Sequence, residues 1–162
     1  MGTLLNWDEI DDLYANHDWD APLSPIKKIL ARPDDLPKET VTALLLNTDT
    51  NSLEKIKTNA TQKDLQTLIK SDDIIIDRIS MGRFCLPVVY SRDFTKDNAM
   101  PSAVDELGRP INFGNLLLFN CDGNDYLSSI LKEDIDYIKN YVSVIYDENT
   151  DSNRTVLTLS WF

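Results

Sequence analysis

The feature that most restricts the fold is a series of short apolar runs separated by turn-forming residues. The runs are rich in Val, Ile, Leu, Thr and aromatic residues, and several alternate apolar with polar positions, which is typical of strands. The polar segments between them carry Asn, Asp and Gly, which favour turns. The runs expected to form strands are residues 40–46, 53–57, 74–79, 84–90, 115–121, 142–146 and 155–162. The last two are predicted to form a C-terminal hairpin.

Two segments between these runs have helical periodicity. Thr61 is suited to cap a helix whose inward face carries Leu65, Leu68 and Ile69. A second helix is expected over about residues 132–140. Hairpins mixed with isolated helices favour an α+β fold over regular βαβ winding.

Residues 1–36 are predicted to be an N-terminal helical appendage and linker, attached to an α+β domain of residues 37–162. Apolar residues recur at helical spacing between residues 7 and 14, and a short second helix is expected at about residues 25–31. The prolines and aspartates of residues 32–37 are typical of a linker. The full expectation is α+β, with a mixed or mainly antiparallel sheet, two or three packed helices and this appendage.

Two local features refine the prediction. Pro87 lies inside one apolar run, and because proline has no N–H group to donate, it indicates an edge strand or a bulge. Residues 91–113 are polar and rich in turn-forming residues, so they are expected to form a loop.

The net charge of -11 restricts the classes of partner. It opposes direct binding to nucleic acid, whose affinity comes from Lys and Arg that neutralise phosphates, and it equally opposes anionic membranes. It favours solubility and a basic partner, through long-range attraction. No apolar run approaches the ~20 residues of a membrane helix, and the first residues do not match a secretory signal, so the predicted location is the cytoplasm.

The supply of catalytic side chains is poor. His17 is the only histidine, so a Cys–His dyad or a Ser–His–Asp triad would have to use it. Cys85 and Cys121 lie in apolar runs and are expected to be buried free thiols. Together these observations favour a protein that is not an enzyme and that needs no cofactor.

Metal binding is also disfavoured by the sequence. One histidine and two cysteines cannot supply a multi-ligand zinc site. Residues 147–153 begin like a calcium loop, but Ser152 replaces the expected glycine and Thr158 replaces the expected acidic residue. A hairpin turn is the preferred interpretation, and no metal is predicted.

The N-terminal segment is the first candidate binding site. Its residues 1–20 combine aromatic side chains with many carboxylates and contain no Lys or Arg, which suits docking into a basic groove. The predicted partner-binding residues are Trp7, Asp8, Glu9, Asp11, Asp12, Tyr14, Asp18 and Trp19. In the alternative interpretation, Trp7 and Tyr14 pack against their own domain.

Two further alternatives remain open. The central arginines would form a small-ligand site for an anion or a nucleotide if the fold gathered them. The residues of that alternative site are Arg78, Arg83, Arg92, Arg109 and Asn112. The apolar C-terminal residues 159–162 would either tuck into the core or seed a homodimer.

Residues 40–138 resemble a family of short phage- and plasmid-borne accessory proteins of unknown function. The resemblance rests on a strand and polar turn leading to a helix at residues 64–69, a segment with the pattern Asp-Glu-x-Gly at residues 105–112, an apolar strand at residues 116–119 and an acidic helix start at residues 131–135. The chain departs from the family pattern at residues 70–72, where a pair of glycines is expected.

The resemblance implies a mobile-element origin and an accessory role, and such proteins often counteract host defence. Together with the charge, it leads to a functional prediction. The protein is expected to be a non-catalytic accessory protein that binds and inhibits or modulates a basic host protein. A nucleic-acid-binding protein is one such partner, since carboxylates spaced like phosphates would act as a DNA mimic.

Overall fold

The apolar runs assemble into one large antiparallel sheet. The structure is a computed structural model that describes residues 28–33, 40–82 and 84–161. The strands of the larger sheet follow the order β12-β3-β4-β7-β1-β2, and all their pairings are antiparallel. Their bounds are β1 Val41–Asn47, β2 Ser52–Thr58, β3 Ile75–Met81, β4 Phe84–Tyr90, β7 Leu116–Leu118 and β12 Ser160–Trp161.

A smaller sheet lies beside the larger one and has the order β10-β11-β5-β6. Its strands are β5 Pro101–Val104, β6 Pro110–Phe113, β10 Val142–Asp147 and β11 Ser152–Thr158. The contact between β11 and β5 is parallel and involves only Leu157 and Thr158 of β11. The predicted C-terminal hairpin is therefore confirmed in β10 and β11, after which the chain crosses to the larger sheet as β12. A short ribbon pairs β8 (Asn120–Cys121) with β9 (Leu127–Ser128).

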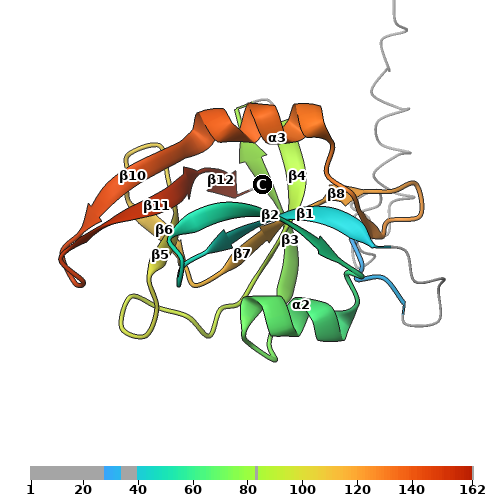
Figure 1. Cartoon of the computed structure of the whole chain (residues 1–162), viewed down its shortest axis with the longest axis horizontal. Helices are drawn as coiled ribbons and strands as arrows, with labels where there is room; N and C mark the ends of the chain where they lie inside the picture. The colour runs from blue at the N-terminus through green and yellow to red at the C-terminus, as the bar shows by residue number, and fades with distance from the viewer. Residues whose placement is uncertain (1–27, 34–39, 83, 162) are drawn as a thin grey trace, which may run out of the picture.

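Two α-helices lie on opposite sides of the strands, α3 above and α2 below in the view of Figure 1. Helix α2 (Gln62–Ile69) begins as predicted, because the side chain of Thr61 accepts a hydrogen bond from the backbone N–H of Asp64. It ends at Lys70, which has left-handed backbone angles. Helix α3 (Lys132–Ile138) continues into the 3-10 turn η1 (Lys139–Tyr141).

The core has two layers because both faces of the larger sheet are covered. In β1, Leu44 and Leu46 point into the cluster that contains α3 and the smaller sheet. Ala43 and Leu45 point into the cluster that contains α2. Since successive side chains of a strand face opposite sides, a segment buried on both faces must be apolar at every position, as residues 43–46 of β1 are.

The predicted α+β class with two or three packed helices is wrong, because the described residues form mostly β-sheet. The predicted helix of the N-terminal appendage between residues 7 and 14 lies outside the described residues. Residues 91–113, expected to be a loop, contain the β5–β6 hairpin, and all four residues of β5 are buried. This segment was missed because its strands are short and begin at prolines, so polar turn residues dominate its pattern.

The expected helix at residues 25–31 is also wrong in its described part. Residues 28–33 are extended, and Leu30 and Arg32 form bridges with Tyr126 and Thr61. The N–H group of Leu30 donates to the carbonyl of Asp125 at 2.8 Å, and Ile29 is buried in the α2-side cluster. Long-range pairing therefore overrides local helical spacing here. Residues 34–39 lie outside the described residues, so the domain boundary at residue 37 stays a prediction.

Pro87 occupies an interior strand in regular register with β3, and not the edge strand or bulge that the sequence indicated. Strand β4 lies between β3 and β7. The carbonyl of Pro87 accepts a hydrogen bond from the N–H of Phe119 at 3.1 Å, one residue beyond the end of β7. Proline has no N–H group to donate, and Pro87 lies where the pairing of β4 with β7 ends. An interior strand can therefore contain this proline.

Candidate interaction surface

Four strands form the outer edges of the two larger sheets in the described part of the chain, and three of them carry a feature that discourages pairing with another strand. Strand β12 has two residues, β6 is short and begins at the exposed Pro110, and β2 carries the exposed Lys55 and Lys57. Short length, proline and lysine are the usual protections of an edge. Strand β10 reads Val-Ser-Val-Ile-Tyr-Asp and has none of them.

The outer edge of β10, here called the β10 edge, is exposed. Among the described residues, β10 pairs only with β11, and its one other backbone hydrogen bond is at its start, where the N–H of Val142 donates to the carbonyl of Lys139. Val144 is 67% exposed and Tyr146 is 58% exposed. Since alternate residues of a strand share a face, these two side chains form a continuous apolar strip beside the free backbone groups.

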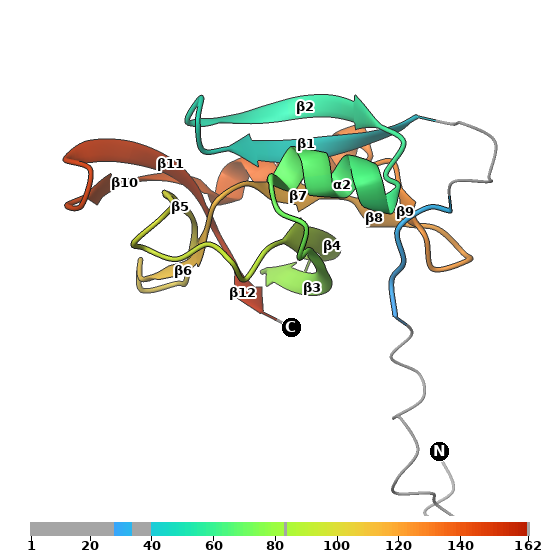
Figure 2. The ribbon, with the colours of Figure 1, turned by 90° about the horizontal axis from the view of Figure 1, so that it is seen from below.

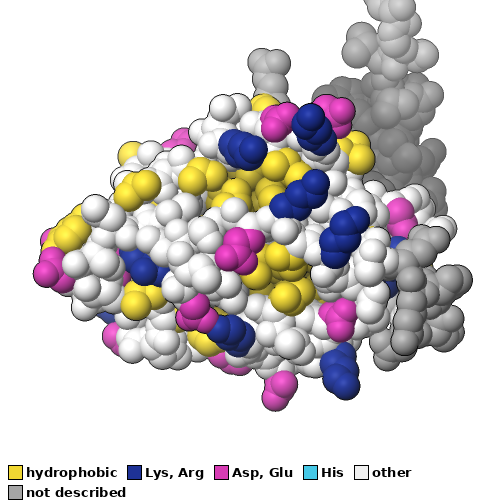
Figure 3. All heavy atoms as spheres, viewed as in Figure 1, with side chains coloured by type: hydrophobic (Ala, Val, Ile, Leu, Met, Phe, Trp, Pro, Cys, Tyr) yellow, Lys and Arg dark blue, Asp and Glu magenta, His cyan; other side chains and the backbone are white. Residues whose placement is uncertain are grey.

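The turn that follows β10, residues 147–151, is acidic and is called the acidic turn below. It carries Asp147, Glu148 and Asp151, and no Lys or Arg occurs between residues 140 and 153. Figure 3 shows apolar and acidic side chains together at this end of the molecule, and most of the Lys and Arg side chains of the same face lie farther away, over β1, β2, α2 and α3. A basic partner would therefore be attracted to the hairpin end.

The acidic turn is internally ordered. The hydroxyl of Tyr146 donates to the carboxylate of Asp151, and the hydroxyl of Thr150 donates to Asp147 at 2.8 Å. The hydrogen bond to Asp151 raises the pKa of Tyr146 above its ordinary value, with smaller contributions from desolvation and from the charge of Asp147. The exposed tyrosine is thereby held next to the carboxylates in its neutral form.

A side-chain amide holds the other edge of the hairpin. Asn51, in the β1–β2 turn, donates from Nδ2 to the carbonyl of Asn153 at 3.1 Å and accepts from the N–H of Thr155 at 2.7 Å. Its amide therefore occupies the edge of β11 in the way that a peptide group of a neighbouring strand would. The hairpin consequently has one edge capped by Asn51 and one edge, that of β10, left free.

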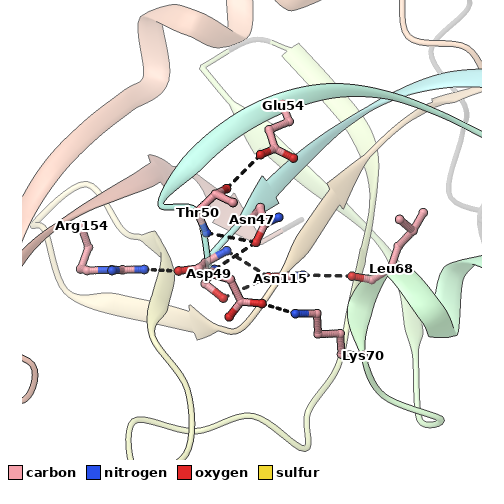
Figure 4. Close-up of polar contacts among 9 residues, drawn as sticks. Asn47, Asp49, Thr50, Glu54, Leu68, Lys70, Asn115 and Arg154 are labelled. Carbon is pink, nitrogen blue, oxygen red and sulfur yellow. Dashed lines mark hydrogen bonds and ion pairs between the residues drawn. The ribbon is translucent and has the colours of Figure 1, made fainter.

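The β1–β2 turn is itself fixed by contacts with Arg154 on one side and Asn115 on the other, as Figure 4 shows. Arg154 of β11 donates to the carbonyl of Thr48. The N–H and the hydroxyl of Thr48 both donate to Oδ1 of Asn115, each at 3.0 Å, and Nδ2 of Asn115 donates to the carbonyl of Leu68 at 3.0 Å. This chain of contacts joins the hairpin to α2. An edge held in place loses less conformational entropy when it binds a partner.

The predicted small-ligand residues are only partly brought together. Arg92 and Asn112 line the same hollow, which has a volume of about 290 Å³ and lies between the end of β4 and β6. Asn112 is buried and donates to the hydroxyl of Ser102 at 2.8 Å. Burial and the charge of Asp77 raise the pKa of Tyr90 at the rim of this hollow, and Arg92 acts in the opposite direction.

The remaining predicted arginines do not join this hollow. Arg78 lies near Cys121, where its charge partly offsets the burial and the Asp125 carboxylate that raise the pKa of that thiol. Arg109 lies in the β5–β6 turn and forms an ion pair with Asp105, 2.8 Å from Nε to Oδ2. Arg83 lies outside the described residues. No cluster of arginines forms in the described part of the chain.

Other predicted features have mixed outcomes. The eight predicted partner-binding residues between positions 7 and 19 lie outside the described residues, and so does His17. Cys85 and Cys121 are free, but Cys85 is exposed and Cys121 is half-buried, so the expectation of two buried thiols is wrong. Within residues 28–33, 40–82 and 84–161, no three His, Cys, Asp or Glu side chains are grouped so that they could hold a metal ion.

Comparisons with known proteins gave no match for this chain. No protein-family model, no curated protein and no solved structure matches it. The resemblance to phage and plasmid accessory proteins therefore stays a prediction. None of the helices formed by the described residues combines the length and the apolar character needed to cross a bilayer.

Proposed function

We propose that this protein acts by binding another protein, a basic one, and that the β10–β11 hairpin supplies part of the contact surface. The observation that carries this proposal is the β10 edge, which lacks protection and lies beside the acidic turn. A surface of this kind offers backbone groups, an apolar strip and negative charge to one partner. The acidic, aromatic residues 7–19 are a second contact in the same proposal.

The net charge of -11 supports a partner with a positively charged surface. Complementary charge speeds association and excludes partners of the wrong sign. The resemblance to mobile-element proteins suggests an accessory role in which binding inhibits or modulates a host protein. A nucleic-acid-binding protein is the partner class with the most extensive basic surface, so a DNA-mimicking role belongs to this proposal.

The test uses the full chain as bait in a lysate of the organism that encodes it, followed by measurement of each captured interaction with purified components. We expect binding to weaken as salt rises, because exposed charge pairs are screened beyond a Debye length of about 10 Å at 0.1 M. The variant D147N/E148Q/D151N, which removes the charge of the acidic turn, should bind several times more weakly. A matched control, K55Q/K57Q on β2, should retain binding.

Two results would contradict the proposal. One is an interaction whose affinity is the same at low and high salt. The other is an interaction that D147N/E148Q/D151N and K55Q/K57Q affect equally, because the acidic turn would then have no special part in it.

The hollow beside Arg92 and Asn112 favours a second candidate function, binding of a small anion or nucleotide. We rank it lower because the buried amide of Asn112 already donates to Ser102, and because the other described arginines lie elsewhere. A thermal-shift screen with nucleotides and inorganic phosphate tests it. A ligand that stabilises the wild-type protein but not Arg92→Gln would favour this candidate over protein binding.

A further inference from the structure

The β10 edge has free backbone groups along a strand of six residues. At a sheet edge, every second residue directs its N–H and C=O groups away from the sheet, where another extended chain can pair with them. Since the described residues leave this edge unpaired and Asn51 caps the opposite edge of the hairpin, only one side of the ribbon is open.

We propose, as an extension of the proposed function and resting on it, that β10 binds its partner by accepting an extended basic segment as an additional antiparallel strand. Strand addition derives affinity from backbone hydrogen bonds and specificity from alternate side chains. Antiparallel pairing is the slightly more stable arrangement per residue. The segment is a piece of the basic partner that is extended when bound.

The exposed strip selects the side chains of that segment. The positions directly opposite Val144 and Tyr146 would contact them across the strands, and aromatic or β-branched residues make the most favourable pairs there. In an antiparallel strand, the residue opposite Tyr146 precedes the residue opposite Val144. The partner therefore carries two β-branched or aromatic residues, separated by one position.

The acidic turn sets the position of the positive charge. It follows the C-terminal end of β10, so in an antiparallel pair it lies beside the N-terminal end of the added strand. Lys or Arg residues placed immediately before the apolar pair would approach Asp147, Glu148 and Asp151. The same lysines placed after the apolar pair would lie at the far end of β10, away from the acidic turn.

Charge also distinguishes this occupant from a second copy of the chain. Two copies would each bring a net charge of -11 to the contact, and this like charge opposes their association. A basic segment gains from the same charge. The structure thus favours a foreign basic strand at the β10 edge over self-pairing.

The experiment measures binding of synthetic peptides to the full chain by chemical-shift changes of its backbone amides. The first peptide is Lys-Lys-Val-Thr-Val-Thr-Val-Ser, acetylated and amidated, and the second has the same composition with both lysines at the C-terminal end. We expect the first to bind about fivefold more tightly, an advantage of the size that two exposed charge pairs supply. The shifts should concentrate in residues 142–147.

N-methylation tests whether the backbone is what binds. Two further peptides have the sequence of the first and carry N-methyl groups on every second backbone amide. The amides methylated in one peptide are those left unmethylated in the other. Only one set can face β10, so one peptide should lose binding by tenfold or more while the other retains it. Equal binding by both methylated peptides would overturn strand addition, because attraction between charges does not depend on those N–H groups.

Variants of Val144 separate edge pairing from charge. Val144→Glu adds negative charge but removes the apolar contact, so strand addition predicts weaker binding of the first peptide, whereas attraction by charge alone predicts stronger binding. Val144→Thr keeps a β-branched side chain and should bind nearly as well as the wild type. Lys55→Thr on β2, an edge strand of the larger sheet, is the control and should leave binding unchanged.

The outcomes keep the two proposals apart. Strand addition is wrong if no peptide binds or if Val144→Glu has no effect on peptide binding. The proposed function still stands in that case if D147N/E148Q/D151N weakens the binding of a natural partner. If the full chain sediments as a dimer that Val144→Lys converts to a monomer, a second copy occupies the edge and the inference is overturned. If the lysine-first peptide binds as expected but no basic protein does, the proposed function fails by itself.

Discussion

The edge strands β2 and β10 each belong to a long hairpin, yet their surfaces differ. Strand β2 carries the exposed Lys55 and Lys57, whereas β10 has no charged residue before Asp147 and exposes Val144 and Tyr146. Lysines on an edge discourage pairing with another chain, because pairing would crowd and desolvate their charges. The difference indicates that one edge is protected against association and that the other is available for it.

The protected hairpin also supports the available one. The turn that joins β1 to β2 contacts β11 through Asn51 and through the carbonyl of Thr48, so the β1–β2 hairpin fixes the position of the β10–β11 hairpin. Figures 1 and 2 show the β10–β11 hairpin extending from one end of the molecule, opposite the β8–β9 ribbon. A projecting hairpin with a fixed base can present its outer strand without distorting the core.

The largest expected effect follows from removing the base of this support. Asn115→Ala should lower the free energy of unfolding by about 2–4 kcal/mol, because the side chain of Asn115 is buried, with 4% of the residue exposed, and its loss leaves partly buried backbone groups of Thr48 and Leu68 without this partner. Urea unfolding measures the change. The control Asn149→Ala, in the exposed acidic turn, should change stability by less than about 0.5 kcal/mol. Equal effects would show that the turn does not depend on Asn115.

A smaller effect is expected when the cap of β11 is removed. Asn51 has a φ of 56°, which glycine adopts readily, so Asn51→Gly removes the amide without adding strain. We expect a loss of about 1–2 kcal/mol for the two hydrogen bonds, and faster hydrogen exchange at the amide of Thr155. Asn51→Asp keeps an acceptor for Thr155 and should show slower exchange there than Asn51→Gly. Unchanged exchange in Asn51→Gly would mean that both edges of the hairpin are equally free.

Replacing the two lysines that protect the edge of β2 should increase self-association modestly. The variant K55V/K57V makes β2 resemble β10, and we expect its apparent mass in light scattering to rise with concentration more steeply than that of the wild type. Lys55→Arg with Lys57→Arg keeps the charge and serves as the control. If K55V/K57V remains as monodisperse as this control, the lysines are not what protects the edge.

The smallest effect concerns the proton of Tyr146. Its pKa is raised above 10.0, chiefly by the hydrogen bond to Asp151, so Asp151→Asn should move the pKa back towards the ordinary value. Because the folded-state pKa is the higher one, this hydrogen bond stabilises the fold below the unfolded pKa, and the contribution disappears as pH rises through the folded pKa. NMR titration of the tyrosine ring signals, assigned with Tyr146→Phe, measures the shift. A Tyr146 pKa that is the same in Asp151→Asn would contradict the assigned cause.

Much of the strand content was predictable from local pattern. Residues 40–46 and 84–90 form β1 and β4 nearly as expected, Thr61 caps α2, and residues 142–146 form the outer strand of a hairpin. These features depend on side-chain alternation and on turn or cap residues, which are visible along the chain. The β5–β6 hairpin was not visible in this way, because β5 is stabilised by pairing with the distant β11, and neither strand has a long apolar run.

The candidate site was less predictable than the fold. The arginine cluster does not form in the described residues, and the roles of Asn51 and Asn115 had no signal in sequence beyond turn-forming composition. An asparagine that caps a strand has the same local sequence as one that faces solvent. Only the position of its partner, about a hundred residues away for Asn51, distinguishes the two.

The sequence by itself determined the strand-forming segments, the net charge of -11 and the absence of Lys and Arg around the last hairpin turn. Tertiary structure alone decided which strands are edges. The reason is that a period of two tells which face a side chain occupies, but strand neighbours are chosen by packing between segments far apart in the chain. The stretch Val-Ser-Val-Ile-Tyr would be an ordinary core strand in another position, and it is an open binding edge here because no described strand lies beyond it.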